Sequence, residues 1–208
     1  MIYSREILAI SISYLIGCIS SGYYLTLLWI GKDIRNSGSS STGAKNVGRI
    51  LGKKGFLITL VLDFIKGITA LLIAIALKPE PWAISLSLIA VTTGHIWPIQ
   101  LRFKGGKGIV VSFAAMLAFD YRITIISFFI FIVLRLCLKN YVISGLVSIG
   151  TMPISAILLK HSGFDLAAIT LLSLIIIFAH RNNILDFVHD RFAPIKSGNW
   201  QQRNKQNG

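Results

Sequence analysis

Long apolar stretches alternate with short polar segments along the whole chain. The first three apolar stretches reach the roughly 20 residues that a membrane-spanning helix needs. Backbone polar groups in lipid must be satisfied within their own segment, so helices are the only plausible spans. The pattern therefore predicts an all-α integral membrane protein, a polytopic bundle of about seven transmembrane helices, over residues 7–30, 56–77, 82–101, 109–119, 123–138, 142–159 and 164–179.

Two of these stretches, residues 109–119 and 123–138, are short for a full crossing. Because about 20 residues are needed to span the hydrocarbon core, the pattern leaves two possibilities open. They form two separate short helices, or they join into one broken or re-entrant element. The side of each loop is better determined than the number of helices.

Basic residues gather in alternate connecting segments. If the N-terminus lies outside, then residues 31–55, 102–108 and 139–141 and the tail 180–208 face the cytoplasm. These segments hold most of the 21 Lys and Arg residues, as cytoplasmic loops of membrane proteins do. The distribution predicts an outside N-terminus and a cytoplasmic C-terminus for a single membrane-embedded domain, residues 1–208.

Composition agrees with a protein that is solvated mostly by lipid. Of the 208 residues, 54% are hydrophobic and 14% are charged, against about 25% charged in soluble domains; the mean hydropathy is +0.70. The formal net charge of +13 favours anionic lipid headgroups or phosphorylated substrates. Because no soluble basic domain is present, we expect no nucleic-acid partner. The two cysteines, Cys18 and Cys137, form no metal-ligand spacing, and we expect no metal and no organic cofactor.

Residues 94–108 end an apolar stretch with a glycine-rich basic loop. Glycine lets backbone N–H groups converge on an anion, and lysine adds positive charge there. A plain juxtamembrane basic cluster explains the charge, but it does not need three glycines in the four positions 105–108. We therefore predict that this loop binds phosphate.

Two other polar segments lie on the same predicted side. Residues 33–49 interleave hydroxyls, glycines and cations, which suits the binding of an oxyanion. A solvated positive-inside loop is an equally good interpretation. Residues 180–183, His-Arg-Asn-Asn, follow the last apolar stretch, where the cap of a helix C-terminus explains them better on local evidence.

Two charged residues, Asp63 and Lys66, stand inside an apolar stretch. An unpaired charge in the middle of the bilayer costs roughly 2.5–3.5 kcal/mol on insertion scales, and pairing three residues apart on a helix lowers that cost. The two residues brace a nearby site or belong to it. His95 is interpreted as a supporting residue, because a single histidine is a weak signal.

Together these segments resemble the bacterial acyl-phosphate:glycerol-3-phosphate acyltransferase family of the PlsY type. The pattern G-H-x-x-P followed by F-K-G-G-K-G is intact within residues 94–108, L-D-x-x-K-G stands at 62–67, and H-R-x-N-I stands at 180–184. The first motif departs from the family in its serine-rich part, where Ser40 and Ser41 replace Gly-Asn and Lys45 replaces Thr. Ser20 replaces Pro, and the Gly-x-Glu after the third motif is absent.

The resemblance implies an enzyme of phospholipid synthesis. It would transfer a fatty acyl group from acyl phosphate to the sn-1 hydroxyl of glycerol 3-phosphate, giving lysophosphatidic acid and phosphate. It would be a multi-pass protein of the bacterial plasma (inner) membrane, surrounded by membrane lipid, with an active site facing the cytoplasm. We expect it to be a monomer.

The resemblance also assigns roles to residues. Those expected to be catalytic are Ser39, Arg49, Lys107, His180 and Asn183. Those expected to bind substrate or phosphate are Lys104, Gly105, Gly106, Gly108, Asn46, Thr42 and Gly43. Those expected to support the site are Asp63, Lys66 and His95.

A small transporter for a phosphorylated or anionic metabolite is the alternative from another class. Transport sites usually lie near the bilayer midplane, whereas most polar residues here lie on one predicted membrane face. The soluble-headed glycerolipid acyltransferases resemble a His-x4-Asp pattern, and no aspartate stands five residues after any histidine of this chain. An acyl-CoA enzyme of that type is therefore excluded.

Overall fold

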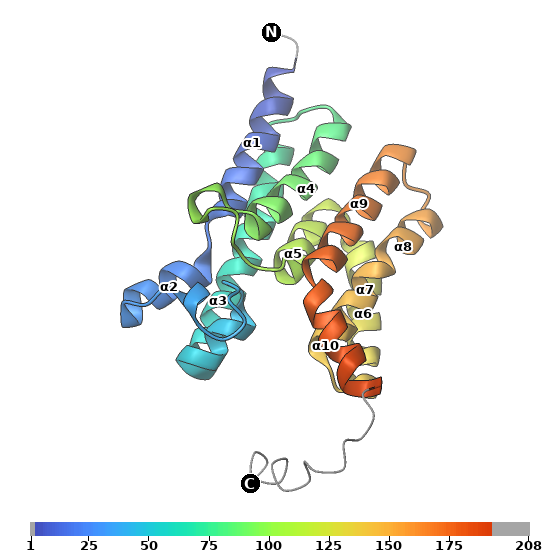
Figure 1. Cartoon of the computed structure of the whole chain (residues 1–208). Coiled ribbons are helices and arrows are strands. Elements are labelled where there is room, and N and C mark those ends of the chain that lie inside the picture. Colours follow the sequence, from blue (N-terminus) through green and yellow to red (C-terminus); the bar gives the residue numbers. More distant parts are fainter. Residues whose placement is uncertain (1–2, 193–208) are drawn as a thin grey trace, which may run out of the picture.

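The computed structural model describes residues 3–192, and all regular elements within that range are helical (Figure 1). The portion of the predicted tail after Phe192 lies outside the described residues. The α-helices are α1 (Ser4–Cys18), α2 (Ser21–Ile30), α3 (Ala44–Ala76), α4 (Pro81–Ile96), α5 (Ile109–Phe119), α6 (Tyr121–Leu138), α7 (Tyr141–Gly150), α8 (Met152–Leu158), α9 (Gly163–Ala179) and α10 (Arg181–Phe192), with 3-10 turns η1 (Ile34–Asn36) and η2 (Ile99–Leu101).

The seven predicted stretches all become helices or pairs of consecutive helices, which confirms the all-α bundle. Within the described range, five segments are long and apolar enough to cross a membrane, and a sixth is reached if α9 and α10, bent by 56°, count as one. The helix α5 is apolar but shorter. It is separated from α6 by Asp120, so the two short stretches are distinct helices. Large apolar side chains such as Leu28, Leu136 and Leu158 are exposed, as lipid-facing positions require.

The predicted stretch 7–30 and the helix α3 each contain a break. Helix α3 also begins at Ala44, before the predicted stretch 56–77, so residues 44–55, expected to belong to the connecting segment 31–55, are helical. The stretch 7–30 is interrupted at Ile19 and Ser20, between α1 and α2. The second break lies inside α3 at Gly52, where φ is 68° and ψ is −168°, a conformation that glycine adopts readily. The break brings Gly48 against the side chain of Phe56, which would be impossible in a straight helix.

Helices α1 and α4 form the most extensive helix–helix contact in the described range, and they meet through small residues. A Cβ atom added at Gly17 would overlap the carbonyl oxygen of Val91, and one added at Gly94 would overlap that of Tyr14. Glycine at both positions lets the two backbones approach closely, a common way of packing helices in membranes. The hydroxyl of Tyr14 also donates to the carbonyl of Trp97 at 2.9 Å. This packing fixes where α4 ends, and so where the glycine-rich loop begins.

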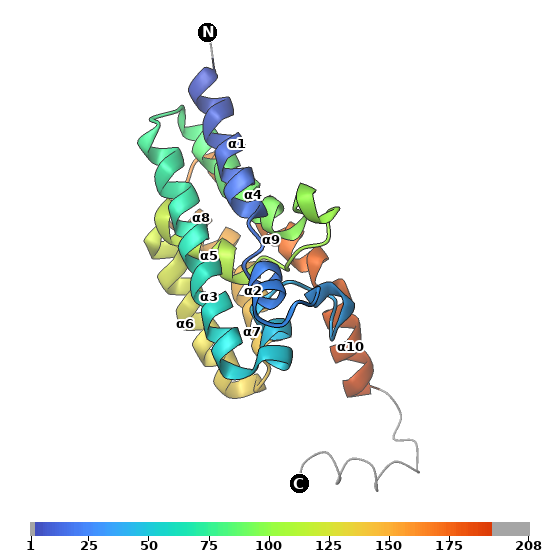
Figure 2. The ribbon, with the colours of Figure 1, turned by 90° about the vertical axis from the view of Figure 1, so that its left-hand side faces the viewer.

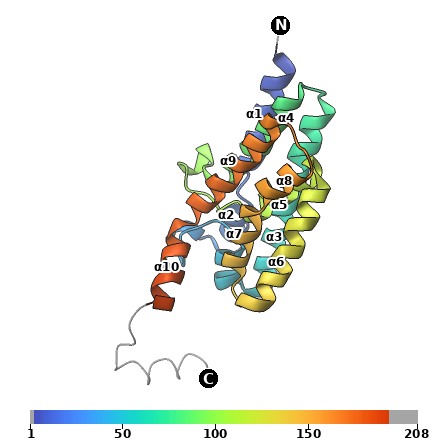
Figure 3. The same cartoon turned by 90° about the vertical axis from the view of Figure 1, so that its right-hand side faces the viewer.

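The bundle has two distinct ends (Figures 1, 2 and 3). The start of α1 and the α3–α4 and α8–α9 turns lie at one end, whereas α2, η1 and α10 lie at the other. The first and last described helices thus reach opposite ends of the bundle. A large core lies among α3, α4, α5, α7 and α9, and a small second core of Leu25, Ile34 and Val47 lies near α2. Which end faces the cytoplasm stays a prediction.

Candidate active site

The serine loop, residues 37–43, is held in shape by one side chain. Asn46 is 1% exposed, and its amide nitrogen donates to the carbonyls of Ser37 and Ser41 at 2.9 Å each. Its amide oxygen accepts from the backbone N–H of Ser39, also at 2.9 Å. We expected Asn46 to bind substrate, but the structure commits its amide to the loop. Its position therefore supports an organising role.

Ser39 and Thr42 take different positions on this loop. Ser39 is exposed, with its backbone anchored by Asn46. Thr42 is 1% exposed, and its hydroxyl has no hydrogen-bond partner among the described residues. The backbone N–H of Thr42 donates to the carbonyl of Gly105 at 3.2 Å, which joins the serine loop to the glycine-rich segment. Gly43 then provides the N-cap position of α3.

The glycine loop, residues 104–108, differs from our expectation in how it uses its amides. The N–H of Gly105 donates to the carbonyl of Ile96 at 3.1 Å, and that of Gly106 to the carbonyl of His95 at 3.0 Å. These two amides therefore point inward. A Cβ atom at either glycine would overlap His95, so glycine is required here by close approach rather than as a cradle for the anion.

The donors that remain for an anion lie at the end of the glycine loop. Gly108, with φ of 89°, occupies the N-cap position of α5. The first N–H groups of a helix have no partner within the helix and form a natural anion site. The loop thus presents the N-terminus of α5 beside Lys107, while Lys104 is exposed to solvent.

Lys107 joins the glycine loop to the third predicted segment. Its ammonium nitrogen donates to the side-chain oxygen of Asn183 on α10. Burial lowers the pKa of Lys107, and the positive charges of Lys45, Arg49 and Arg181 lower that pKa further, whereas Asp186 opposes them. Lys107 thus lies in the electric field of three other cations, Lys45, Arg49 and Arg181. Asp186 is the carboxylate whose charge acts on Lys107.

His180 lies at the junction of α9 and α10 and is 3% exposed. Its Nδ1 lies 2.9 Å from the carbonyl oxygen of Ile176. A carbonyl only accepts, so the hydrogen bond assigns the proton to Nδ1 and leaves Nε2 as an acceptor in the neutral ring. The histidine thus closes the end of α9, as the cap interpretation predicted, and also keeps one ring nitrogen available.

Arg49 lines a cleft of about 290 Å³ beside the break in α3. The other lining residues are Lys45, Gly48, Lys53 and Phe56. The cleft exists because the break at Gly52 folds the first turns of α3 against the following ones. Its lining includes three basic side chains and one aromatic ring, which suits an anion attached to an apolar group.

The sequence interpretation missed a brace between the two loops. Arg35 forms hydrogen bonds with both carboxylate oxygens of Asp33, the shortest of 2.6 Å, and donates to the carbonyl of Leu101 at 2.8 Å. The hydrogen bond from Arg35 holds the pKa of Asp33 below its ordinary value. The Asp-Ile-Arg triplet at residues 33–35 was the local sign of the Asp33–Arg35 pair. The contact with Leu101 has no such sign, because Leu101 lies 66 residues away and accepts through its backbone carbonyl.

The three residues predicted to support the site, Asp63, Lys66 and His95, form one buried polar network next to the glycine loop. Lys66 lies 3.1 Å from Asp63, 2.8 Å from Nδ1 of His95, and 2.6 Å from the carbonyl of Ile19. Each of the three charged or ring side chains is less than 10% exposed. This network connects the carbonyl of Ile19, at the α1–α2 break, to His95, against which Gly106 packs. The three residues therefore support the loops from inside the protein.

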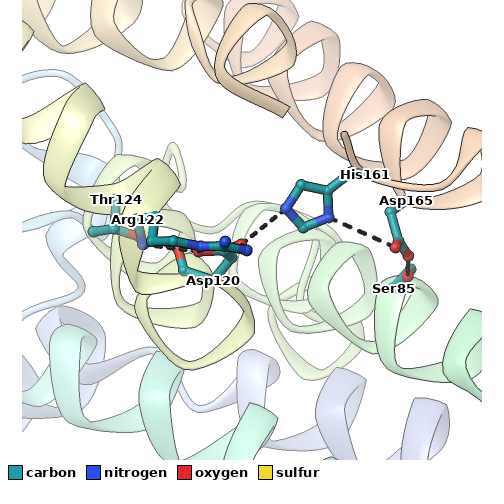
Figure 4. Close-up of polar contacts among 6 residues, drawn as sticks. All are labelled: Ser85, Asp120, Arg122, Thr124, His161 and Asp165. Carbon is teal, nitrogen blue, oxygen red and sulfur yellow. Dashed lines mark hydrogen bonds and ion pairs between the residues drawn. The ribbon is translucent and has the colours of Figure 1, made fainter. Parts of the chain in front are cut away.

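A second polar cluster joins α4, the α5–α6 junction and the α8–α9 turn (Figure 4), and that turn lies at the opposite end of the bundle from α2 and α10 (Figure 1). There Asp120 accepts from Arg122 at 2.7 Å and lies 2.8 Å from Nε2 of His161. His161 also lies 3.7 Å from Asp165, which accepts from Ser85 at 2.6 Å. Burial by itself would raise the pKa of Asp120, but the hydrogen bonds from Arg122 and His161 lower it to about 2. Between residues 3 and 192, no group of three or more His, Cys, Asp or Glu side chains has the arrangement of a metal site.

Comparisons with known proteins give one consistent result. A family model described as Glycerol-3-phosphate acyltransferase matches residues 7–190. The chain is 37% identical to Glycerol-3-phosphate acyltransferase 1 of Desulfitobacterium hafniense, over 85% of this chain and 88% of that protein. It is 41% identical to the protein of the same name from a Bacillus cereus strain, over 78% and 89%. The crystal structure of PlsY, an integral membrane glycerol 3-phosphate acyltransferase, in its glycerol 3-phosphate form matches with a TM-score of 0.83 and 28% identity, over 89% of this chain and 93% of that one.

Proposed function

The chain belongs to the glycerol-3-phosphate acyltransferase family, and from that premise we propose how its loops handle the two substrates. The protein is a multi-pass membrane acyltransferase that transfers an acyl group to glycerol 3-phosphate and produces lysophosphatidic acid. We propose that the acyl donor is acyl phosphate, a mixed anhydride. Its leaving group is phosphate, so both substrates carry a phosphoryl group.

The observation that carries this proposal is the meeting of three segments that lie far apart in the sequence. Thr42 bonds to Gly105, and Lys107 bonds to Asn183. The resulting site gathers cations and helix N–H groups and holds few carboxylates. Departure of phosphate from an anhydride needs stabilisation of negative charge more than it needs a strong base, and fixed cations and N–H groups supply it.

In the proposed reaction, the primary hydroxyl of glycerol 3-phosphate attacks the acyl carbonyl carbon, and the bond from that carbon to the phosphate oxygen breaks. Lys107, Lys104, Arg49, Ser39 and the start of α5 hold phosphate. Asn183 and His180 orient glycerol 3-phosphate, with Nε2 of His180 accepting from the attacking hydroxyl. The hydroxyl proton passes to His180 or to an oxygen of the departing phosphate, and the acyl chain lies between helices.

We further propose that the protein acts as a monomer and a single domain in the bacterial inner membrane, with the site open to the cytoplasm. The basic loops support this orientation, because cytoplasmic loops carry an excess of Lys and Arg. Soluble glycerol 3-phosphate would then reach the site from the cytoplasm, while the fatty donor reaches it from the membrane.

The donor is tested with purified protein, palmitoyl phosphate and glycerol 3-phosphate, measuring phosphate and lysophosphatidic acid together. We expect the two products in equal amounts, and none from palmitoyl-CoA offered in place of palmitoyl phosphate. Lysophosphatidic acid formed from the thioester alone would overturn the donor assignment and leave the family assignment intact.

A further inference from the structure

Lys45 occupies a position where a positive charge is unfavourable. It is the second residue of α3 and is exposed, and it lies four residues before Arg49 on the same helix. Like charges four residues apart on a helix repel each other. A cation in the first turn also opposes the helix dipole, whose N-terminal end is positive. The protein therefore carries a local electrostatic cost at Lys45.

The surroundings of Lys45 add to that cost. Lys45, Arg49 and Lys53 line the same cleft beside the α3 break, and none of the residues lining it is acidic. Lys45 is also the charge that most lowers the pKa of Lys107, after the effect of burial. The positive charge of Lys45 therefore acts both on the cleft and on the ammonium group of Lys107.

A bound anion would convert these repulsions into attractions. Phosphate is the suitable class, because both substrates of the proposed reaction and its released product carry phosphoryl groups. Phe56 forms an apolar wall of the cleft, which leaves room for an apolar group attached to the anion. The threonine of the family pattern at this position offers a hydroxyl but no charge.

We propose that Lys45 is a phosphoryl ligand, which binds, together with Arg49 and Lys53, a phosphate group in the cleft at the Gly52 break. This inference rests on the proposed function and adds to it a binding residue at a position where the family pattern has threonine. The phosphoryl group belongs either to the acyl donor or to glycerol 3-phosphate, and the chemistry of recognition is the same for both.

The test compares Lys45→Thr with Lys54→Thr in purified, folded protein. Lys54 is an exposed lysine of the same helix that lies over the ring of Trp29, 5.9 Å from its centroid, and it does not line the cleft. Both variants lose one positive charge, so non-specific attraction of anions falls equally. We expect Lys45→Thr to raise the KM for one of the two substrates about tenfold, because a hydrogen bond to a charged group contributes about 1.5–3 kcal/mol. Lys54→Thr should change the same KM less than twofold.

Separate titrations distinguish the sources of the phosphoryl group. A rise in KM for palmitoyl phosphate assigns the cleft to the donor, and a rise in KM for glycerol 3-phosphate assigns it to the acceptor. Inhibition by inorganic phosphate should weaken in the same variant, and Lys45→Arg should retain most of the affinity.

The pH profile measures a second consequence of losing the charge of Lys45, which does not depend on phosphoryl binding. Without Lys45, the pKa of Lys107 rises, so Lys107 stays protonated to higher pH and the alkaline limb of activity moves upward. Other charges that act on Lys107, namely Arg49, Arg181 and Asp186, stay in place. Equal KM values for Lys45→Thr and Lys54→Thr, whatever the pH profiles, would overturn the proposal. Absence of any product from the wild-type protein would instead contradict the proposed function.

Discussion

The two ends of the bundle use charged side chains in opposite ways. At the basic end, Lys45, Arg49 and Lys107 lie in one another's field, opposed by Asp186. At the paired end, the cluster of Ser85, Asp120, Arg122, His161 and Asp165 has two carboxylates, and each of them contacts a cation, a histidine or a hydroxyl (Figure 4).

The difference indicates that the basic end serves substrate binding and the paired end serves the stability of the fold. Clustered cations repel each other and cost free energy of folding, so they persist where an anion is to be bound. Paired charges at the other end join α4, α6 and α9. The pair Asp33–Arg35 shows that the basic end also contains a brace, but this brace connects η1 to the carbonyl of Leu101. We therefore expect substitutions at the basic end to lower turnover, and those at the paired end to lower stability.

The largest effect is expected for Lys107→Met. Removal of one group that stabilises developing negative charge typically costs 100-fold or more in turnover. The thermal midpoint should change little, because burial and neighbouring cations already oppose the charge of Lys107. Turnover with palmitoyl phosphate, beside the thermal midpoint in detergent, checks this, with Lys54→Met as the control for lost charge. A turnover within threefold of wild type would refute the role of Lys107.

A loss of stability is expected for Asp120→Asn. The change weakens hydrogen bonds with Arg122 and His161, and each hydrogen bond to a charged group contributes about 1.5–3 kcal/mol before solvent screening. Because Arg122 is half exposed, we expect a total loss of about 1–2 kcal/mol. Turnover at a temperature where the variant is folded should stay within twofold. The exposed Glu80→Gln is the matched control, and equal thermal midpoints for the two variants would contradict the prediction.

The contribution of Asp120 should also depend on pH. Its pKa in the folded protein, about 2, lies below the ordinary value of 3.8. The stabilisation is therefore complete above the ordinary pKa and is lost as the pH falls through the folded value. The difference in thermal midpoint between wild type and Asp120→Asn should narrow from pH 6 to pH 2.5. A gap that widens toward low pH would contradict this assignment.

The smallest effect is expected for Ser40→Gly at the basic end. Ser40 has φ of 55°, where the family pattern has glycine, and a non-glycine residue in the left-handed region costs roughly 1–2 kcal/mol. Glycine removes that strain but loses more conformational entropy on folding, so we expect a net gain of about 0.5 kcal/mol. Chemical or thermal unfolding measures the change, and a clear destabilisation would show that the serine side chain holds the loop.

The sequence predicted the helices well because the apolar stretches are long and lipid imposes internal hydrogen bonding. It did not predict the break at Ser20, because a short interruption leaves the apolar content of the stretch 7–30 unchanged. It also placed residues 44–55 in a connecting segment, although they form the first turns of α3. The segment contains Gly48, Gly52 and Gly55, and glycine is unfavourable inside a helix, so its composition did not indicate helix. The φ of 68° at Gly52 shows where α3 bends. The contact of Gly48 with Phe56 depends on that turn.

For the candidate site, the motifs identified which segments matter but not how each residue acts. Asn46 was expected at the substrate, yet its amide holds three backbone groups of the serine loop. Gly105 and Gly106 were expected to offer amides to phosphate, yet they lie against His95. Hydrogen-bond partners distant in sequence have no local signal, so such roles require the three-dimensional arrangement.

The most direct test of the contrast replaces one arginine at each end, Arg49→Ala and Arg122→Ala, in folded, purified protein. Arg49 lines the basic cleft, whereas Arg122 forms an ion pair with Asp120 at 2.7 Å. Turnover of palmitoyl phosphate with glycerol 3-phosphate and the thermal midpoint are measured for both. We expect Arg49→Ala to lose most of its turnover and keep its thermal midpoint, and Arg122→Ala to keep its turnover while its midpoint falls by a few degrees. Unchanged turnover in Arg49→Ala, or an equal loss in both variants, would contradict it.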